Sequence, residues 1–227
     1  KVREAHPRSE AKKTRLPLAA ARENRFKFDW SAYQPPRPKL LGTRAFTNYP
    51  LAELVPYIDW TPFFSTWELS GKYPRILDDN VVGVEAKKLF ADAQAMLKRV
   101  VAENWIQAGA AIGFWPATIS DYDVLVYGDE SRTAPIATLH TLRQQMTREQ
   151  GRPNLALSDF IAPPKEHGGT ADYIGGFAVT AGIGEEKHLE AFRAAKDDYS
   201  AILLSALSDR LAEAFAERLH ERVRKEF

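Results

Sequence analysis

The chain contains no cysteine among its 227 residues. This absence excludes disulfides, thiolate-held iron–sulfur clusters and zinc sites built on cysteine, and it agrees with a cytoplasmic protein, which we expect this one to be. No apolar run approaches the roughly 18–20 residues that a membrane-spanning helix requires. Nothing in the sequence resembles a signal peptide. A disulfide scaffold and a membrane span are therefore not predicted.

The net charge is also small, because 31 Lys and Arg offset 30 Asp and Glu to give +1. This balance argues against nucleic acid or an anionic membrane as a partner of the whole chain. The five histidines show no paired metal-ligand spacing, and no nucleophile elbow or glycine-rich phosphate loop occurs. Two acid pairs, Asp78 with Asp79 and Asp197 with Asp198, could serve as metal ligands or general bases, but they are interpreted as helix N-terminal or bend acids. No catalytic or metal-binding residue is predicted.

Aromatic residues make up 11% of the chain and concentrate in residues 56–74, which include Tyr57, Trp60, Phe63, Phe64, Trp67 and Tyr73. Thr61 followed by Pro62 predicts a helix with Thr61 as its N-cap and Pro62 at its first position, and Gly71 predicts its end. Asp59 lies just before this helix. The segment is interpreted either as a buried aromatic anchor or as a groove with Asp59 as a ligand-facing carboxylate at its lip.

Hydrophobic periodicity predicts a helix over residues 83–103, with an apolar face formed by Val84, Leu89, Ala93, Met96, Leu97 and Val100. Residues 110–116 and 123–127 predict two strands of a hairpin joined by a turn at 118–121. Residues 135–139 predict a third strand that continues into a helical stretch at 142–148. Short apolar runs follow at 155–161 and 173–180.

These consecutive strands with helices before and after them predict an α+β fold. We expect a single domain with a mainly antiparallel twisted sheet, flanking helices and a long C-terminal helical region. A parallel sheet is not expected, because too little chain separates the strands for helical crossovers.

Residues 1–25 are basic and contain few large apolar side chains. Such a segment predicts an interdomain linker or an arm on another surface, with a nucleic-acid arm as the alternative. The domain proper is assigned to residues 26–227. The start at Lys1 and the helical pattern running to Phe227 predict a fragment of a longer protein.

From Glu185 the chain is predicted to be helical, with a bend near residues 196–198. Its apolar stripe recurs every four residues at Leu203, Leu207, Leu211, Phe215, Leu219 and Val223. Glu213 lies off this stripe. It is interpreted as a solvated glutamate paired with Arg210 at i−3.

A resemblance adds to this interpretation. The run YIDWTPFFSTWELSGKYPRIL, continuing into DDNVVGVEAKKLFADAQAML, resembles the opening of the activation domain of cobalamin-dependent methionine synthase. Residues 109–116, 129–145, 158–163 and 171–182 resemble interior blocks of the same family, and DRLAEAFAERLHERVRK resembles its long helix. The resemblance covers nearly everything from residue 28 to residue 227.

The resemblance implies that the domain binds S-adenosylmethionine and that Asp59 and Glu213 line the site. It implies support for reductive remethylation of cob(II)alamin, with an electron from flavodoxin or an equivalent flavoprotein. Cobalamin is then bound by a neighbouring domain of the parent chain, and zinc belongs to the parent enzyme only. That parent enzyme transfers a methyl group from methyltetrahydrofolate to homocysteine.

The sequence departs from the family in one respect, because the family's arginine and glycine–tyrosine–proline motif lies downstream of the last helix, beyond Phe227. The isolated fragment is therefore expected to bind S-adenosylmethionine weakly or not at all, and to be inactive. The alternative function is a non-enzymatic interaction module that caps a corrinoid-binding domain without binding S-adenosylmethionine.

Overall fold

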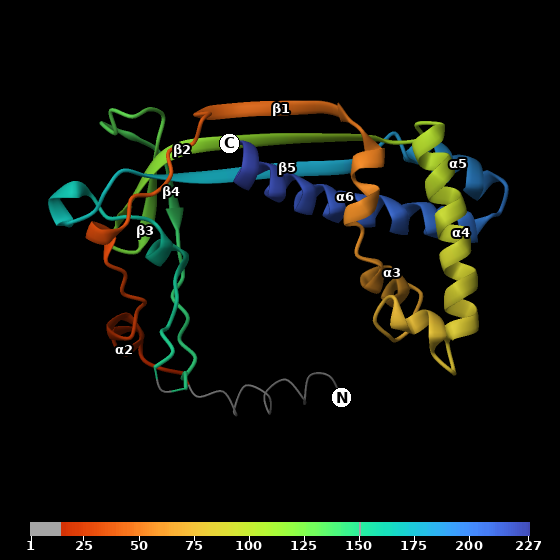
Figure 1. The fold of residues 1–227 in the computed structure, drawn as a ribbon, viewed down its shortest axis with the longest axis horizontal. Helices are drawn as coiled ribbons and strands as arrows, with labels where there is room; N and C mark the ends of the chain where they lie inside the picture. Colours follow the sequence, from red (N-terminus) through yellow and green to blue (C-terminus); the bar gives the residue numbers. More distant parts are fainter. Residues whose placement is uncertain (1–14, 150) are drawn as a thin grey trace. The chain divides into compact units, whose positions relative to one another are not determined.

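The computed structural model describes residues 15–149 and 151–227. The chain forms two compact units (Figure 1). Unit 1 comprises Lys1–Gly42 and Gly113–Gly176, and unit 2 comprises Thr43–Ile112 and Phe177–Phe227.

One five-stranded sheet has the order β1-β2-β3-β4, with β5 paired to β2. Its strands are β1 (Gly42–Tyr49), β2 (Gln107–Ser120), β3 (Asp123–Tyr127), β4 (Pro135–His140) and β5 (Asp172–Ile183). Both β2 with β3 and β3 with β4 are antiparallel. The fold class predicted from the sequence is therefore confirmed, since the flanking helices and the long C-terminal helix are also present.

In unit 1 the predicted hairpin is confirmed, and its turn is tighter than expected. Ser120 pairs directly with Asp123, so that only Asp121 and Tyr122 form the loop. Asp121 takes the left-handed conformation with φ 54°, which aspartate tolerates in such turns. The core here consists of Ala117, Val124 and Val126, against which Trp115, Ile119, Ile161 and Ile174 pack.

The helix predicted at residues 142–148 is wrong. This segment is irregular, and the backbone N–H of Gln144 donates to the carbonyl of Leu155 at 2.9 Å. The buried amide of Asn154 donates to the carbonyls of Gln144 and Met146. Hydrogen bonds to the backbone of Leu155 and the side chain of Asn154 thus take the place of helical hydrogen bonds. The run at 155–161 contains a short 3-10 helix, η5 (Leu157–Phe160).

The described part of the basic N-terminal segment contains helix α2 (Leu18–Glu23), which packs within unit 1. Ala21 is fully buried, and the side-chain amide of Asn24 donates to Asn154 at 2.8 Å. The linker prediction for residues 1–14 lies outside the described residues, and the domain start at residue 26 stays a prediction.

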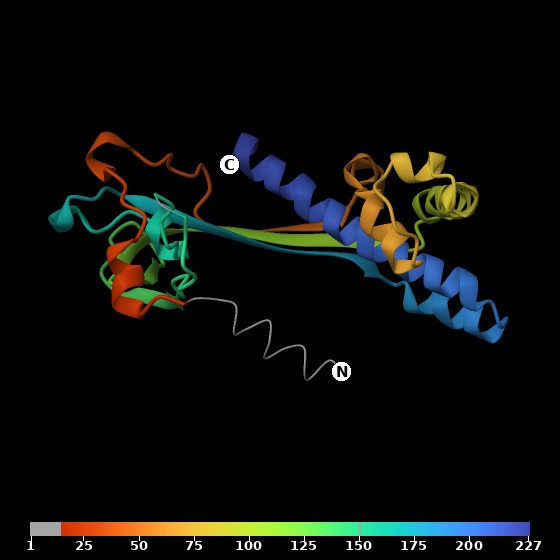
Figure 2. The ribbon, with the colours of Figure 1, turned by 90° about the horizontal axis from the view of Figure 1, so that it is seen from below.

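Unit 2 contains helices α3 (Trp60–Thr66), α4 (Gly83–Ala102), α5 (Glu186–Ala194) and α6 (Asp198–Glu226). The first three pack against α6 (Figures 1 and 2). The helix predicted at 83–103 is confirmed, although Val84 is 79% exposed and was wrongly assigned to its apolar face. The predicted bend is confirmed as a break between α5 and α6, where Lys196 has φ 59°.

The apolar stripe of α6 forms the centre of this unit. Its residues Leu203, Leu207, Leu211, Phe215 and Leu219 are at most 2% exposed. Phe215 packs on Tyr49 of β1 with ring centroids 4.5 Å apart. Among the described residues, no helix is both long and apolar enough to cross a membrane.

Candidate functional site

Asp59, and not Thr61, is the N-cap of α3, so the predicted helix start was two residues late. The Asp59 Oδ1 accepts a hydrogen bond from the backbone N–H of Thr61 at 2.9 Å. The Thr61 hydroxyl instead accepts from the backbone N–H of Tyr73 at 3.2 Å. Pro62 is the third residue of the helix, where its missing N–H is again harmless.

Asp59 is exposed, whereas the rings that follow it are not. Trp60 is 7% exposed, and Phe63 and Phe64 are fully buried. Trp60 and Phe63 meet edge to face with centroids 5.3 Å apart. The three rings therefore form a core under α3, and the anchor interpretation holds for them. Asp59 remains at the surface with Oδ2 as an acceptor that makes no hydrogen bond within residues 15–149 and 151–227.

Glu213 lies on α6 between buried positions and points to solvent. Its side chain is 64% exposed, while the neighbouring Ala214 and Phe215 are 2% exposed or less. Both carboxylate oxygens accept hydrogen bonds from Arg210, at 2.6 and 2.9 Å. The ion pair predicted at i−3 is thus confirmed, and its strength is modest because Glu213 is exposed. A carboxylate has about four acceptor positions, so Glu213 can still accept further donors.

Asp59 and Glu213 both belong to unit 2, on elements that pack together. In the described part of the chain they form no hydrogen bond with each other and share no common partner. The 3-10 helix η3 (Val55–Tyr57), just before Asp59, packs on α6 as α3 does. The structure therefore brings the two acids into one unit without joining them in a single network.

A polar cluster that sequence reasoning missed joins η3 to α6. The Tyr57 hydroxyl donates to the carboxylate of Glu221, and Arg218 bonds Glu221 at 3.1 Å and Glu53 at 3.3 Å. Hydrogen bonds from Lys225, Tyr57 and Arg218 lower the pKa of Glu221 to about 2. Tyr57 and Glu221 are 164 positions apart, so no local sequence signal could have paired them.

The two acid pairs act as predicted, at helix ends. Asp79 Oδ1 accepts from the backbone N–H groups of Val81 and Val82, and these bonds lower the pKa of Asp79. Asp197 caps α6 by accepting from the Ser200 N–H at 3.0 Å. Within residues 15–149 and 151–227, no three His, Cys, Asp or Glu side chains gather as a metal site would require.

The pKa of Tyr199, at the start of α6, is shifted strongly by the surroundings of this side chain. The Tyr199 ring lies against Trp67, with centroids 5.2 Å apart, and its hydroxyl donates to Asp92 of α4 at 2.7 Å. Burial raises the pKa of Tyr199 to about 12, and the bond to Asp92 acts in the same direction. Folding thus favours the neutral phenol of this residue.

We expect this contribution to stability to be fully present below pH about 10, the pKa of an unfolded tyrosine, and to be lost as the pH rises through about 12. Tyr199→Phe removes the titrating group. The difference in unfolding free energy between wild type and Tyr199→Phe should therefore narrow across this alkaline range. Urea unfolding at several pH values measures it, and a difference independent of pH would contradict the assignment.

Comparison with known proteins identifies the family. Residues 50–227 match the family model described as the vitamin B12 dependent methionine synthase activation domain. The chain therefore belongs to this family. It is similar to a crystal structure described as the MetH reactivation domain bound to AdoHcy, with 51% sequence identity and a TM-score of 0.86. The similarity covers 94% of this chain and 64% of that one.

Proposed function

We propose that this domain binds S-adenosylmethionine and presents it for methyl transfer to a cobalamin carried by its parent protein. The observation that carries the proposal is the 51% identity to a reactivation domain whose structure holds AdoHcy. AdoHcy is what remains of S-adenosylmethionine after its methyl group has left. A site that holds this product is suited to present the methyl donor.

Asp59 and Glu213 are proposed as ligands of S-adenosylmethionine. The donor carries a sulfonium and an ammonium group, and exposed carboxylates attract such cations. Asp59 suits this role because its N-cap bond fixes one oxygen on α3 while the other stays open to solvent. Glu213 suits it because its exposed carboxylate is oriented by Arg210. Neither residue performs covalent chemistry, and their role is to position the donor.

The rest of the proposal concerns the parent protein. Cobalamin, bound by a neighbouring domain of the parent chain, supplies the cobalt that accepts the methyl group once it is reduced. The electron is proposed to come from flavodoxin or an equivalent flavoprotein. The parent is proposed to be a cytoplasmic methionine synthase that transfers methyl from methyltetrahydrofolate to homocysteine, with zinc in another of its domains.

The binding role of Asp59 is tested by Asp59→Asn, because asparagine caps a helix about as well as aspartate but carries no charge. In the full-length protein that carries this domain, we expect S-adenosylmethionine to bind roughly tenfold to a hundredfold more weakly in this variant, as expected for loss of a charged hydrogen bond. Isothermal calorimetry measures the affinity. Asp79→Asn is the matched control, since Asp79 is another aspartate of unit 2 whose Oδ1 accepts from backbone N–H groups just before a helix, and it should leave the affinity unchanged.

The alternative function, an interaction module without S-adenosylmethionine binding, predicts a different result. If Asp59→Asn binds as wild type does and only Asp59→Ala loses affinity together with helix stability, Asp59 is a cap and not a ligand. If the wild type itself does not bind S-adenosylmethionine, the proposed function is wrong.

A further inference from the structure

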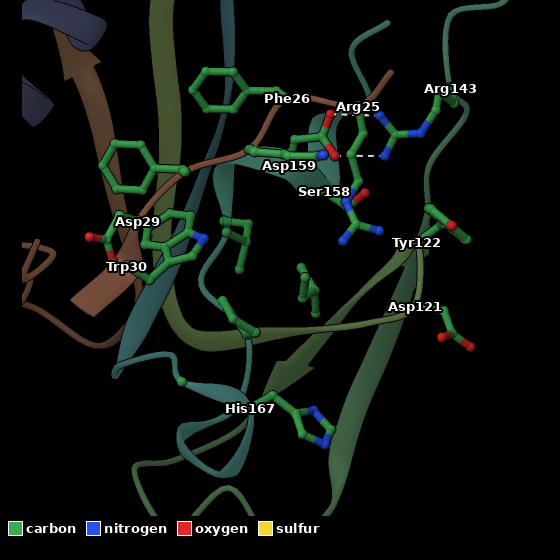
Figure 3. Close-up of a pocket in the computed structure, with 16 residues that line it drawn as sticks. Arg25, Phe26, Asp29, Trp30, Asp121, Tyr122, Arg143, Ser158, Asp159 and His167 are labelled. Carbon is green, nitrogen blue, oxygen red and sulfur yellow. Dashed lines mark hydrogen bonds and ion pairs between the residues drawn. The ribbon is translucent and has the colours of Figure 1, made fainter. Parts of the chain in front are cut away.

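Unit 1 contains a cavity that the proposed function does not use (Figure 3). Its volume is about 450 Å³, within the range of pockets that hold small organic molecules. Aromatic and apolar side chains form much of its lining, among them Trp30, Tyr122, Ile119 and Ile161. All of its lining residues belong to unit 1, whereas Asp59 and Glu213 belong to unit 2.

The aromatic wall is held in place by ring packing and a turn. Trp30 packs edge to face on Phe28 with centroids 4.7 Å apart, and Phe26 stacks on Phe160 at 5.6 Å. Asp29 fixes the turn that carries Trp30 by accepting hydrogen bonds from the Ser31 N–H at 3.0 Å and the Ser31 hydroxyl at 2.6 Å. The wall is thus formed before any ligand arrives, which lowers the entropic cost of binding.

Three basic side chains, Arg25, Lys27 and Arg143, and three carboxylates, Asp29, Asp121 and Asp159, line the cavity. Figure 3 shows the guanidinium of Arg25 directed into the space between Trp30 and Tyr122. The carboxylates of Asp29 and Asp121 are directed away from this space, on opposite sides. Among the described residues, the Arg25 guanidinium makes no hydrogen bond or ion pair.

The third carboxylate of the lining, Asp159, is already neutralised. Arg143 binds both of its oxygens, at 2.6 and 2.8 Å. Arg25 therefore has no counter-charge bonded to it in a place lined by rings, and an anionic group would supply one.

We infer that this cavity is a binding site for a small planar organic anion, whose ring packs against Trp30 and whose carboxylate or sulfonate pairs with Arg25. The site differs in chemistry from the one proposed around Asp59 and Glu213, because those carboxylates suit a cation.

The test uses 2-naphthoate and its uncharged analogue 2-naphthamide, which share a ring system and differ in charge. Binding to the full-length protein is followed by calorimetry and by the indole N–H resonance of Trp30, assigned by its loss in Trp30→Phe. We expect naphthoate to shift this resonance and to bind roughly tenfold more tightly than naphthamide, as expected for one charge-assisted bond. Arg25→Gln should abolish that preference.

Arg152→Gln is the matched control, because Arg152 belongs to unit 1, is exposed and lies outside the cavity lining. It changes the net charge by the same amount and should leave the preference intact. Equal binding of the two probes, or a preference for naphthoate that survives Arg25→Gln, would overturn the inference. Failure of naphthoate to move the Trp30 resonance would overturn it as well, and none of these results depends on S-adenosylmethionine binding.

Discussion

Phe63→Ala is expected to destabilise the protein by about 3–5 kcal/mol, the usual cost of deleting a fully buried phenylalanine ring. Phe63 is fully buried beneath α3 and meets Trp60 and Phe64 edge to face, at 5.3 and 5.6 Å. Its removal leaves a cavity among rings that lack small groups able to fill it. The loss in unfolding free energy includes that of the edge-to-face contacts, which stabilise by about 0.5–1.5 kcal/mol each in addition to the burial of apolar area.

Phe177→Ala is the control, because it makes the same chemical change in unit 2 at a side chain that is 41% exposed. We expect it to cost less than about 1.5 kcal/mol, since much of its ring already contacts water. Urea unfolding followed by tryptophan fluorescence gives both values. Equal losses for the two variants would show that the rings under α3 do not form the core described above. A stable Phe63→Ala variant with weakened S-adenosylmethionine affinity would instead place Phe63 in the ligand site.

The parts of the fold that the sequence predicted are those with a strong local signal. The apolar stripe of α6 recurs every four residues, and it is the stripe that the structure buries. The β2–β3 hairpin was predicted from two apolar runs around a polar turn, but β2 is longer and the turn is shorter than predicted. Periodicity is set by the geometry of the element itself and so is visible without knowledge of its neighbours.

The failures have two different causes. Thr61 has the residue type of an N-cap, but Asp59, two residues earlier, has it too and takes that position, and Thr61 bonds to Tyr73. The stretch at 142–148 has helix-forming residues, but Arg143 and Gln144 bond to residues of the 154–159 segment instead. In that stretch tertiary contacts overrode local propensity.

The candidate site, like the fold, could be predicted from the sequence only in part. Physical reasoning on Glu213 correctly gave its exposure and its pairing with Arg210. A ligand role for Glu213 and Asp59 came only from the resemblance, because an exposed carboxylate has no sequence pattern of its own. The cavity around Arg25 could not be predicted at all, since its walls come from four separate parts of unit 1.

Arg143→Leu is expected to destabilise the protein by about 3–5 kcal/mol, because it leaves the Asp159 carboxylate buried and unpaired. The side chains of Arg143 and Asp159 are only 3% and 6% exposed. Arg143 also donates to the carbonyl of Asn154 at 2.7 Å, so a second buried acceptor loses its partner. The hydrogen bond to Asp159 raises the pKa of Arg143. Urea unfolding measures the loss of stability.

A double-mutant cycle separates this pairing from packing alone. Asp159→Asn keeps an oxygen that can accept from the Ala156 N–H, which now donates to Asp159 at 2.9 Å, but it removes the charge. If the loss in Arg143→Leu comes from the unpaired carboxylate, the double variant Arg143→Leu/Asp159→Asn should be more stable than the sum of the two single losses predicts. Additive losses would mean that Arg143 contributes only packing and its bond to Asn154.

The same pair should affect the cavity around Arg25, because Asp159 and Arg25 both line it. Without Arg143, the charge of Asp159 is free to neutralise Arg25, so Arg143→Leu should weaken naphthoate binding. Adding Asp159→Asn removes that charge and should restore the binding.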